Sequence, residues 1–205
     1  MRSIQLATLV ASLALTGCAM TPTPRVQGGQ PFALPPAEAD QFRIGAIHVE
    51  AAPRVRDRYA QSRNLTPEPG ETFTYDEKSQ EADYDFRTDF EFEVRQELKR
   101  CATGSRPLNA VILVDNLVYD DRLRSLVDGK GYDVVGGVVE LTDPAQGDRI
   151  VARYRIEAGT NSGGLLTRIL GDRLDAMAEE FGRALCMEAF GQNPRGHPIF
   201  NTTRG

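Results

Sequence analysis

The side chains with the most distinctive chemistry in this chain are its thiols and its imidazoles. The 205-residue sequence contains three cysteines, Cys18, Cys101 and Cys186, and two histidines, His48 and His197. Histidine is the side chain best suited to act as a general base near neutral pH. The sequence has neither a Gly-x-Ser-x-Gly nucleophile elbow nor a histidine pair at metal-binding spacing. We therefore expect a protein that is not an enzyme and that carries no metal or other cofactor.

Two further groups of residues invite a chemical interpretation. Gly129-Lys130-Gly131 lacks the upstream glycine and the downstream Ser or Thr of a phosphate-binding loop, so we expect a hairpin turn there. Asp115, Asp120 and Asp121 could pair as carboxylates. We expect them instead to end a strand and to solvate the loop that follows.

The first 18 residues carry the clearest signal in the chain. Arg2 supplies a positive charge, an apolar run from Ile4 to Ala14 follows, and Leu15-Thr16-Gly17-Cys18 ends the segment. The apolar run is too short to span a bilayer and is typical of a signal peptide. Its last four residues resemble the bacterial lipobox. The resemblance implies that residues 1–17 are removed and that Cys18 is acylated; the alternative is an ordinary secretory signal with an incidental cysteine.

The lipid anchor sets the expected location and limits the expected partners. Ala19, instead of Asp, follows Cys18, and by resemblance to the sorting rule of Gram-negative lipoproteins this favours the outer membrane. More than one acyl chain holds a protein firmly, so we expect it to stay on the membrane and to face the periplasm. The formal net charge is −5. We expect no nucleic-acid partner, because nucleic acid requires a basic surface.

The composition divides the chain into four parts. Residues 1–17 form the signal peptide, residues 18–41 the lipidated cysteine and a Pro-rich tether, and residues 42–190 a single domain. Residues 191–205 form a flexible tail. Within the domain, a polar insert from Arg54 to Ala82 has no role that its sequence reveals.

Hydrophobic periodicity in the domain predicts four strands and two helices. The predicted strands are Phe42–Glu50, Asn109–Val114, Tyr132–Leu141 and Ile150–Ala158. The first helix extends from about Tyr84 to Arg100, and its apolar stripe is Phe86, Phe90, Val94 and Leu98. The second helix follows capping residues at Thr160-Asn161-Ser162, and its apolar stripe extends from Leu166 to Leu185.

This order of elements predicts an α+β fold. We expect a four-stranded mixed sheet in β-α-β-β-β-α order, with both helices packed on one face. The strand directions are up, up, down and up, so the two helices are parallel. The last strand alternates cleanly and directs Arg153 and Arg155 away from the helices, where we expect them to face solvent or a partner.

The two cysteines that remain after acylation fall near the ends of the two predicted helices. Because the helices are parallel, Cys101 and Cys186 lie at the same end of the sheet. The small residues Ala178, Gly182 and Cys186 would let the helices approach closely. We predict a disulfide between Cys101 and Cys186, in an oxidising compartment, and the alternative is a pair of buried thiols.

The lipobox, the element order and the long terminal amphipathic helix together resemble a group of periplasmic lipoproteins. The group comprises the auxiliary lipoproteins of lipid-transporting ABC systems, the curli secretion lipoprotein and the activators of penicillin-binding proteins, and the likeness covers Phe42 to Phe190. It implies an accessory protein that recruits or holds a component of an envelope assembly. The alternative function is a lipid or small-ligand carrier with a pocket between the helices and the sheet.

Overall fold

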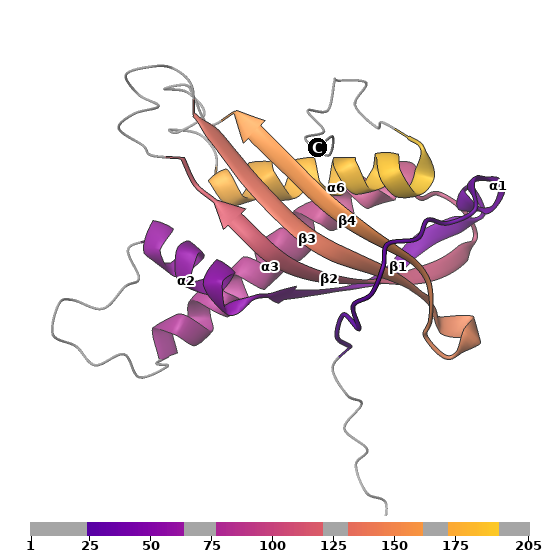
Figure 1. Cartoon of the computed structure of the whole chain (residues 1–205), viewed down its shortest axis with the longest axis horizontal. Helices are drawn as coiled ribbons and strands as arrows, with labels where there is room; N and C mark the ends of the chain where they lie inside the picture. Colours follow the sequence, from indigo (N-terminus) through magenta and orange to yellow (C-terminus); the bar gives the residue numbers. More distant parts are fainter. Residues whose placement is uncertain (1–23, 64–76, 121–130, 162–171, 193–205) are drawn as a thin grey trace, which may run out of the picture.

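The computed structural model describes residues 24–63, 77–120, 131–161 and 172–192 (Figure 1). The elements in these residues are α1 (Pro36–Ala39), β1 (Phe42–Ala51), α2 (Pro53–Ser62), α3 (Glu77–Cys101), β2 (Arg106–Val118), β3 (Tyr132–Asp143), the 3-10 helix η1 (Pro144–Gln146), β4 (Arg149–Asn161) and α6 (Arg173–Phe190). The predicted signal peptide, Cys18, Ala19 and most of the predicted tail lie outside the described residues. Within the described residues, no helix is both long and apolar enough to cross a membrane.

The four strands form one mixed sheet in the order β1-β2-β3-β4, which confirms the predicted fold class. β1 and β2 are parallel, and β3 is antiparallel to both of its neighbours. The register shifts between Ile44 and Ile47, near the glycine where the alternation of the sequence breaks. A Cβ at Gly137 would lie 2.6 Å from the carbonyl oxygen of Leu113, so this position requires a glycine.

Helices α3 and α6 lie on one face of the sheet, behind it in Figure 1. We call the opposite face the open face. The predicted apolar stripe of α3 packs between the helix and the sheet, and all four of its members are fully buried: Phe86, Phe90, Val94 and Leu98. The helix begins at Glu77, seven residues before the predicted start.

Helix α6 begins later than the sequence pattern predicted. Thr160 and Asn161 do not cap it, because β4 continues through Asn161. The carboxylate of Asp172 caps the helix instead and accepts a hydrogen bond from the Leu174 amide at 2.9 Å. The predicted stripe residues Leu166 and Leu170 lie outside the described residues.

The two helices are parallel and approach closely, as predicted. The rings of Phe90 and Phe181 meet edge to face at 5.3 Å between centroids. Further along, a Cβ placed on Gly182 would lie 2.9 Å from the Glu97 Cβ and 3.2 Å from the Val94 Cα. The absence of a side chain at Gly182 therefore sets the distance between the helices.

The predicted tether is folded onto the domain along part of its length. Residues 25–34, which we call the strap, cross the open face and then the edge of β4 (Figure 1). Phe32 pairs with Arg153 in an isolated antiparallel bridge, so the strap extends the sheet by one short contact. Leu34 is buried beyond this edge, and its amide donates to the Tyr154 hydroxyl at 2.8 Å.

The strap is therefore held against the domain, although the sequence pattern indicated only a Pro-rich tether over residues 18–41. The reason is a buried carboxylate. Glu140 is 1% exposed and accepts the backbone amides of Gln27 and Gly28 at 2.9 and 3.0 Å. A buried carboxylate requires such donors, and they come from a segment without any apolar periodicity.

Substitution of Gly182 tests the close packing of the helices. The Gly182→Val variant should lower the free energy of unfolding by about 1–3 kcal/mol, because the added atoms would overlap α3. The matched control is Ala176→Val, a partly exposed position of the same helix. Urea unfolding of both variants measures the difference, and equal stabilities would show that the helices do not depend on this glycine.

Candidate interaction surface

The structure brings Cys101 and Cys186 together in a disulfide, as predicted from the sequence. Their Cα atoms are 5.9 Å apart, and both residues are buried. The bond joins the carboxyl-terminal part of α6 to the last residue of α3. Because it is enclosed in the core, we assign it a structural role. Cys18, the predicted lipidation site, lies outside the described residues.

Arg153 is on the open face, but it does not face solvent as expected. Its side chain is 11% exposed. Its Nε donates to Glu140 at 2.8 Å, its Nη1 donates to the Gln30 carbonyl at 3.3 Å, and its guanidinium lies 5.8 Å from the Phe32 ring. The strap therefore occupies the place where we expected a partner.

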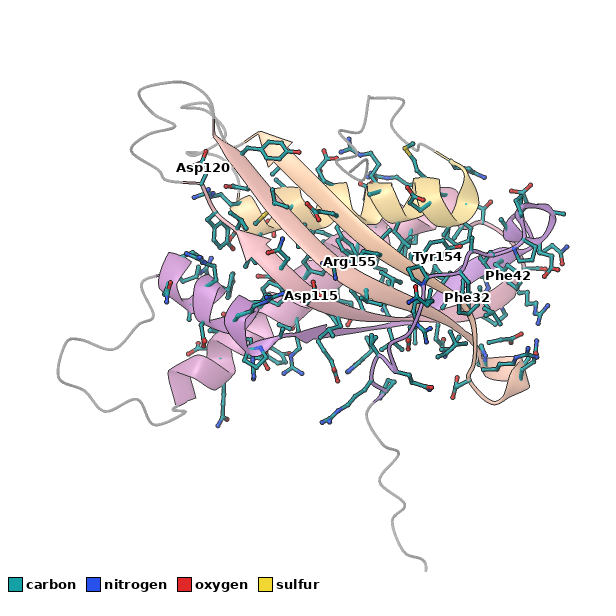
Figure 2. The ribbon with its side chains drawn as sticks, in the orientation of Figure 1. Phe32, Phe42, Asp115, Asp120, Tyr154 and Arg155 are labelled. Atoms are coloured by element: carbon teal, nitrogen blue, oxygen red, sulfur yellow. A yellow bond between two sulfur atoms is a disulfide. The ribbon has the colours of Figure 1, made fainter. Side chains whose placement is uncertain are left out.

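Arg155 remains accessible, with 40% of its side chain exposed. It forms an ion pair with Asp115 of β2 across the open face (Figure 2). Asp115 thus pairs with an arginine and not with a second carboxylate. Of the two arginines predicted to face a partner, only Arg155 is on an open part of the surface.

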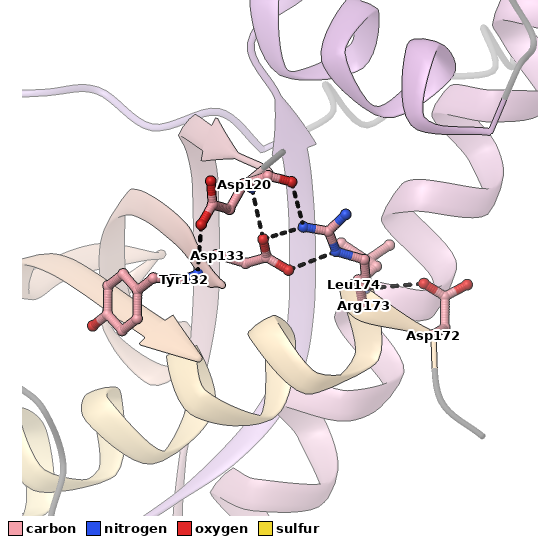
Figure 3. Close-up of polar contacts among 6 residues, drawn as sticks. All are labelled: Asp120, Tyr132, Asp133, Asp172, Arg173 and Leu174. Carbon is pink, nitrogen blue, oxygen red and sulfur yellow. Dashed lines mark hydrogen bonds and ion pairs between the residues drawn. The ribbon is translucent and has the colours of Figure 1, made fainter. Parts of the chain in front are cut away.

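A buried ion pair fastens the start of α6 to the sheet (Figure 3). Arg173 donates from Nε to Asp133 Oδ2 at 2.6 Å and from Nη2 to the other carboxylate oxygen. The Asp120 amide donates to Asp133 at 2.9 Å, and the Asp120 carboxylate accepts the Tyr132 amide at 3.1 Å. Asp120 is therefore an anchor between the end of β2 and the start of β3, and Asp121 lies outside the described residues.

The other residues singled out for their chemistry lie mostly outside the described residues. His48 Nε2 lies 3.6 Å from Glu50 on the open face, and His197 lies outside the described residues, as do Gly129 and Lys130. In the described ranges, no group of three or more His, Cys, Asp or Glu side chains is placed to hold a metal ion.

A groove between α3 and β1 is a candidate surface for binding another molecule. We call it the α3–β1 groove, and its volume is about 460 Å³. Its lining residues are His48, Val49, Tyr84, Arg87, Thr88, Glu91, Phe92 and Arg95. Tyr84 is 64% exposed and Phe92 is 56% exposed, although both are large aromatic side chains.

This groove was not predicted from the sequence, although one signal was available. Phe92 follows Phe90 by two residues, so it points away from the apolar stripe of α3. Tyr84, Thr88 and Phe92 are spaced four residues apart and form a second line along the helix. An aromatic residue outside the core stripe is a candidate for an interface.

The groove follows the edge of β1, and the two halves of this edge differ. In the first half, Thr103 bridges to Arg43, and Arg95 Nη1 donates to the Gly45 carbonyl at 3.0 Å. In the second half, from Ile47 to Ala51, the only described strand that pairs with β1 is β2. An edge strand directs alternate backbone groups outward, so in the described residues the outward groups of this half have no partner strand.

Carboxylates crowd together where the first turns of α6 meet α3 and α2. Burial raises the pKa of Asp89, and the nearby Asp85 and Asp172 carboxylates raise it further, while Arg63 lowers it. Burial likewise raises the pKa of Asp175, with added contributions from Asp172 and Asp89. Arg63 pairs with Asp172 at 2.9 Å and offsets part of this repulsion.

Comparison with known proteins gives no family assignment. No family model and no curated protein matches the chain. The chain is similar to a crystal structure of protein XCC0632 from Xanthomonas campestris, described by the family model DUF330. The two share 16% sequence identity with a TM-score of 0.35, over 77% of this chain and 87% of that chain. These values are too low to carry an argument about function.

Removal of the disulfide should lower stability strongly. In a Cys18→Ser background, replacing both Cys101 and Cys186 by Ala opens a loop with a sequence separation of 85 residues. We expect the free energy of unfolding in guanidinium chloride to fall by about 2–5 kcal/mol, because the unfolded chain gains freedom. Thiol titration of the denatured, unreduced parent should find no free thiol. Two free thiols would contradict the pairing.

The carboxylate cluster predicts a pH-dependent gain in stability for Asp89→Asn. The pKa of Asp89 is raised in the folded state. At a pH above the pKa of Asp89 in the unfolded chain, about 4, ionisation of this carboxyl group therefore destabilises the folded state. The variant should therefore be more stable than the parent at pH 7, and the gain should vanish as the pH falls below about 4. Asp57→Asn, at an exposed position of α2, is the control. A variant less stable than the parent at pH 7 would contradict the repulsion.

Proposed function

We propose that this chain is a lipid-anchored, non-enzymatic accessory protein of the outer membrane that faces the periplasm. It holds or recruits a protein component of an envelope assembly or transport system. The lipobox residues Leu15-Thr16-Gly17-Cys18 support the anchor. The α3–β1 groove supports the role in binding a protein.

The observation that carries the proposal is the pair of exposed aromatic residues in the groove. Aromatic and arginine side chains are enriched at protein interfaces and supply much of their binding energy. Tyr84 and Phe92 lie in one groove with Arg87 and Arg95, next to the second half of the β1 edge, Ile47–Ala51. Exposed aromatic side chains at such a position stabilise a complex more than they stabilise the free domain.

No observation favours the alternative function, a carrier with a pocket between the helices and the sheet. Large side chains fill that space in the described residues. Phe86, Phe90 and Phe181 contribute from the helices, and Ile112 and Leu141 contribute from the sheet, each with less than 2% exposure. A lipid would have to displace this packed core, at the cost of the burial that stabilises the domain.

Site-specific photocrosslinking from the membrane-bound protein tests the proposal. A photoreactive amino acid at Thr88, in the groove, should crosslink to one protein partner, and the same group at Met187, exposed on α6, should not. Phe92→Ala should lower the yield from Thr88 about tenfold, because an aromatic anchor is lost. Cys18→Ser should abolish labelling with palmitate and leave an unprocessed precursor.

The outcomes separate the alternatives. Equal crosslinking from Thr88 and Met187, or none from either, would contradict a specific binding surface in the groove. Co-purification of lipid without a protein partner would support the carrier instead. Labelling of the Cys18→Ser variant with palmitate would exclude the lipid anchor at this residue.

A further inference from the structure

The strap determines where the membrane anchor leaves the folded domain. The Nε atom of Arg25 lies 3.7 Å from the Oε1 atom of Glu50 on β1, on the open face. From there the strap contacts Glu140 of β3 and then Arg153 of β4, so it crosses the sheet from one side to the other. The chain therefore leaves the domain from its open face. It does not leave from the layer formed by α3 and α6, which we call the helical layer.

The chain between the anchor and the strap is short. Seven peptide units separate Cys18 from Arg25, and a fully extended chain of that length spans at most about 25 Å. A domain of about 150 residues has a radius of roughly 20 Å. To turn the helical layer toward the membrane, this short chain would have to leave the open face and pass around an edge of the domain, which leaves less of its length to reach the anchor.

The charges on the open face of the sheet and on the layer formed by α3 and α6 also favour placing the open face, and not the helices, next to the membrane. On the open face, the Arg153–Glu140 and Arg155–Asp115 pairs neutralise one another. The helical layer is acidic: from Gln80 onward α3 carries seven acidic and four basic residues, and α6 carries four acidic and two basic residues. Anionic lipids repel an acidic surface more than a neutral one.

We propose that the strap holds the domain with the open face of its sheet toward the membrane and with α3 and α6 toward the periplasm. This orientation rests on the proposed lipid anchor at Cys18. It presents the α3–β1 groove beside the helical layer, where a periplasmic partner can reach it. The membrane surface, through its lipid headgroups, is the occupant of the space next to the open face.

Quenching of a fluorophore by headgroup-labelled lipid tests the orientation. The acylated protein is reconstituted in vesicles of phosphatidylethanolamine and phosphatidylglycerol that contain a lipid with a nitroxide headgroup. One fluorophore is attached at Glu157→Cys on the open face, or at Thr88→Cys in the groove. We expect about twofold stronger quenching at position 157 than at position 88, because roughly one domain radius separates the two layers.

A longer tether provides the matched control. A Gly/Ser insertion of about 20 residues after Thr23 leaves the strap intact but lets the domain rotate, so the difference in quenching should shrink. Equal quenching at the two positions of the parent, or stronger quenching at position 88, would overturn the orientation alone. Failure of the protein to float with the vesicles would overturn the lipid anchor, and the orientation with it.

Discussion

The close parallel contact between α3 and α6 is the constraint on which the rest of the structure depends. Gly182 lets the two backbones approach, and the Cys101–Cys186 disulfide fixes their carboxyl-terminal parts at that distance. Together the helices cover one face of the sheet with large apolar side chains. Helix α6 packs against one side of α3, and in the described part of the chain Tyr84 and Phe92 lie exposed on another side of α3, next to β1.

Buried charges hold the other parts of the domain in register. Asp133 and Glu140 are almost completely inaccessible, and each is satisfied by an arginine and by backbone amides. Such groups contribute little net stability when they are paired, but they are costly when a partner is lost. These buried ion pairs therefore specify which segments of the chain come together. Asp133 fixes where α6 starts, and Glu140 fixes where the strap crosses the sheet.

Other segments of the chain contact the two edge strands, β4 and β1, in different ways. This difference connects the fold to the proposed function. At β4, the strap bridges through Phe32 and interrupts the edge. At β1, the bridge from Thr103 and the hydrogen bond from Arg95 protect the first half. An accessible edge favours association with other chains. In the proposed function, association with a partner takes place at one short segment, Ile47–Ala51, beside the exposed aromatic residues of α3.

The sequence by itself predicted the order of the four strands and the two long helices, the α+β class and a disulfide between Cys101 and Cys186, but not the short helix α1. These features follow from periodicities of about two and 3.6 residues and from chain direction, which are local properties. Only the tertiary structure decided the path of the strap, the partners of Arg153 and the exposure of Phe92. The hydrogen bond from Gln27 to Glu140 joins residues 113 positions apart, and such a contact has no periodic signature. Whether an aromatic residue outside the core stripe is exposed depends on which element packs beside it, and that is a property of the folded molecule.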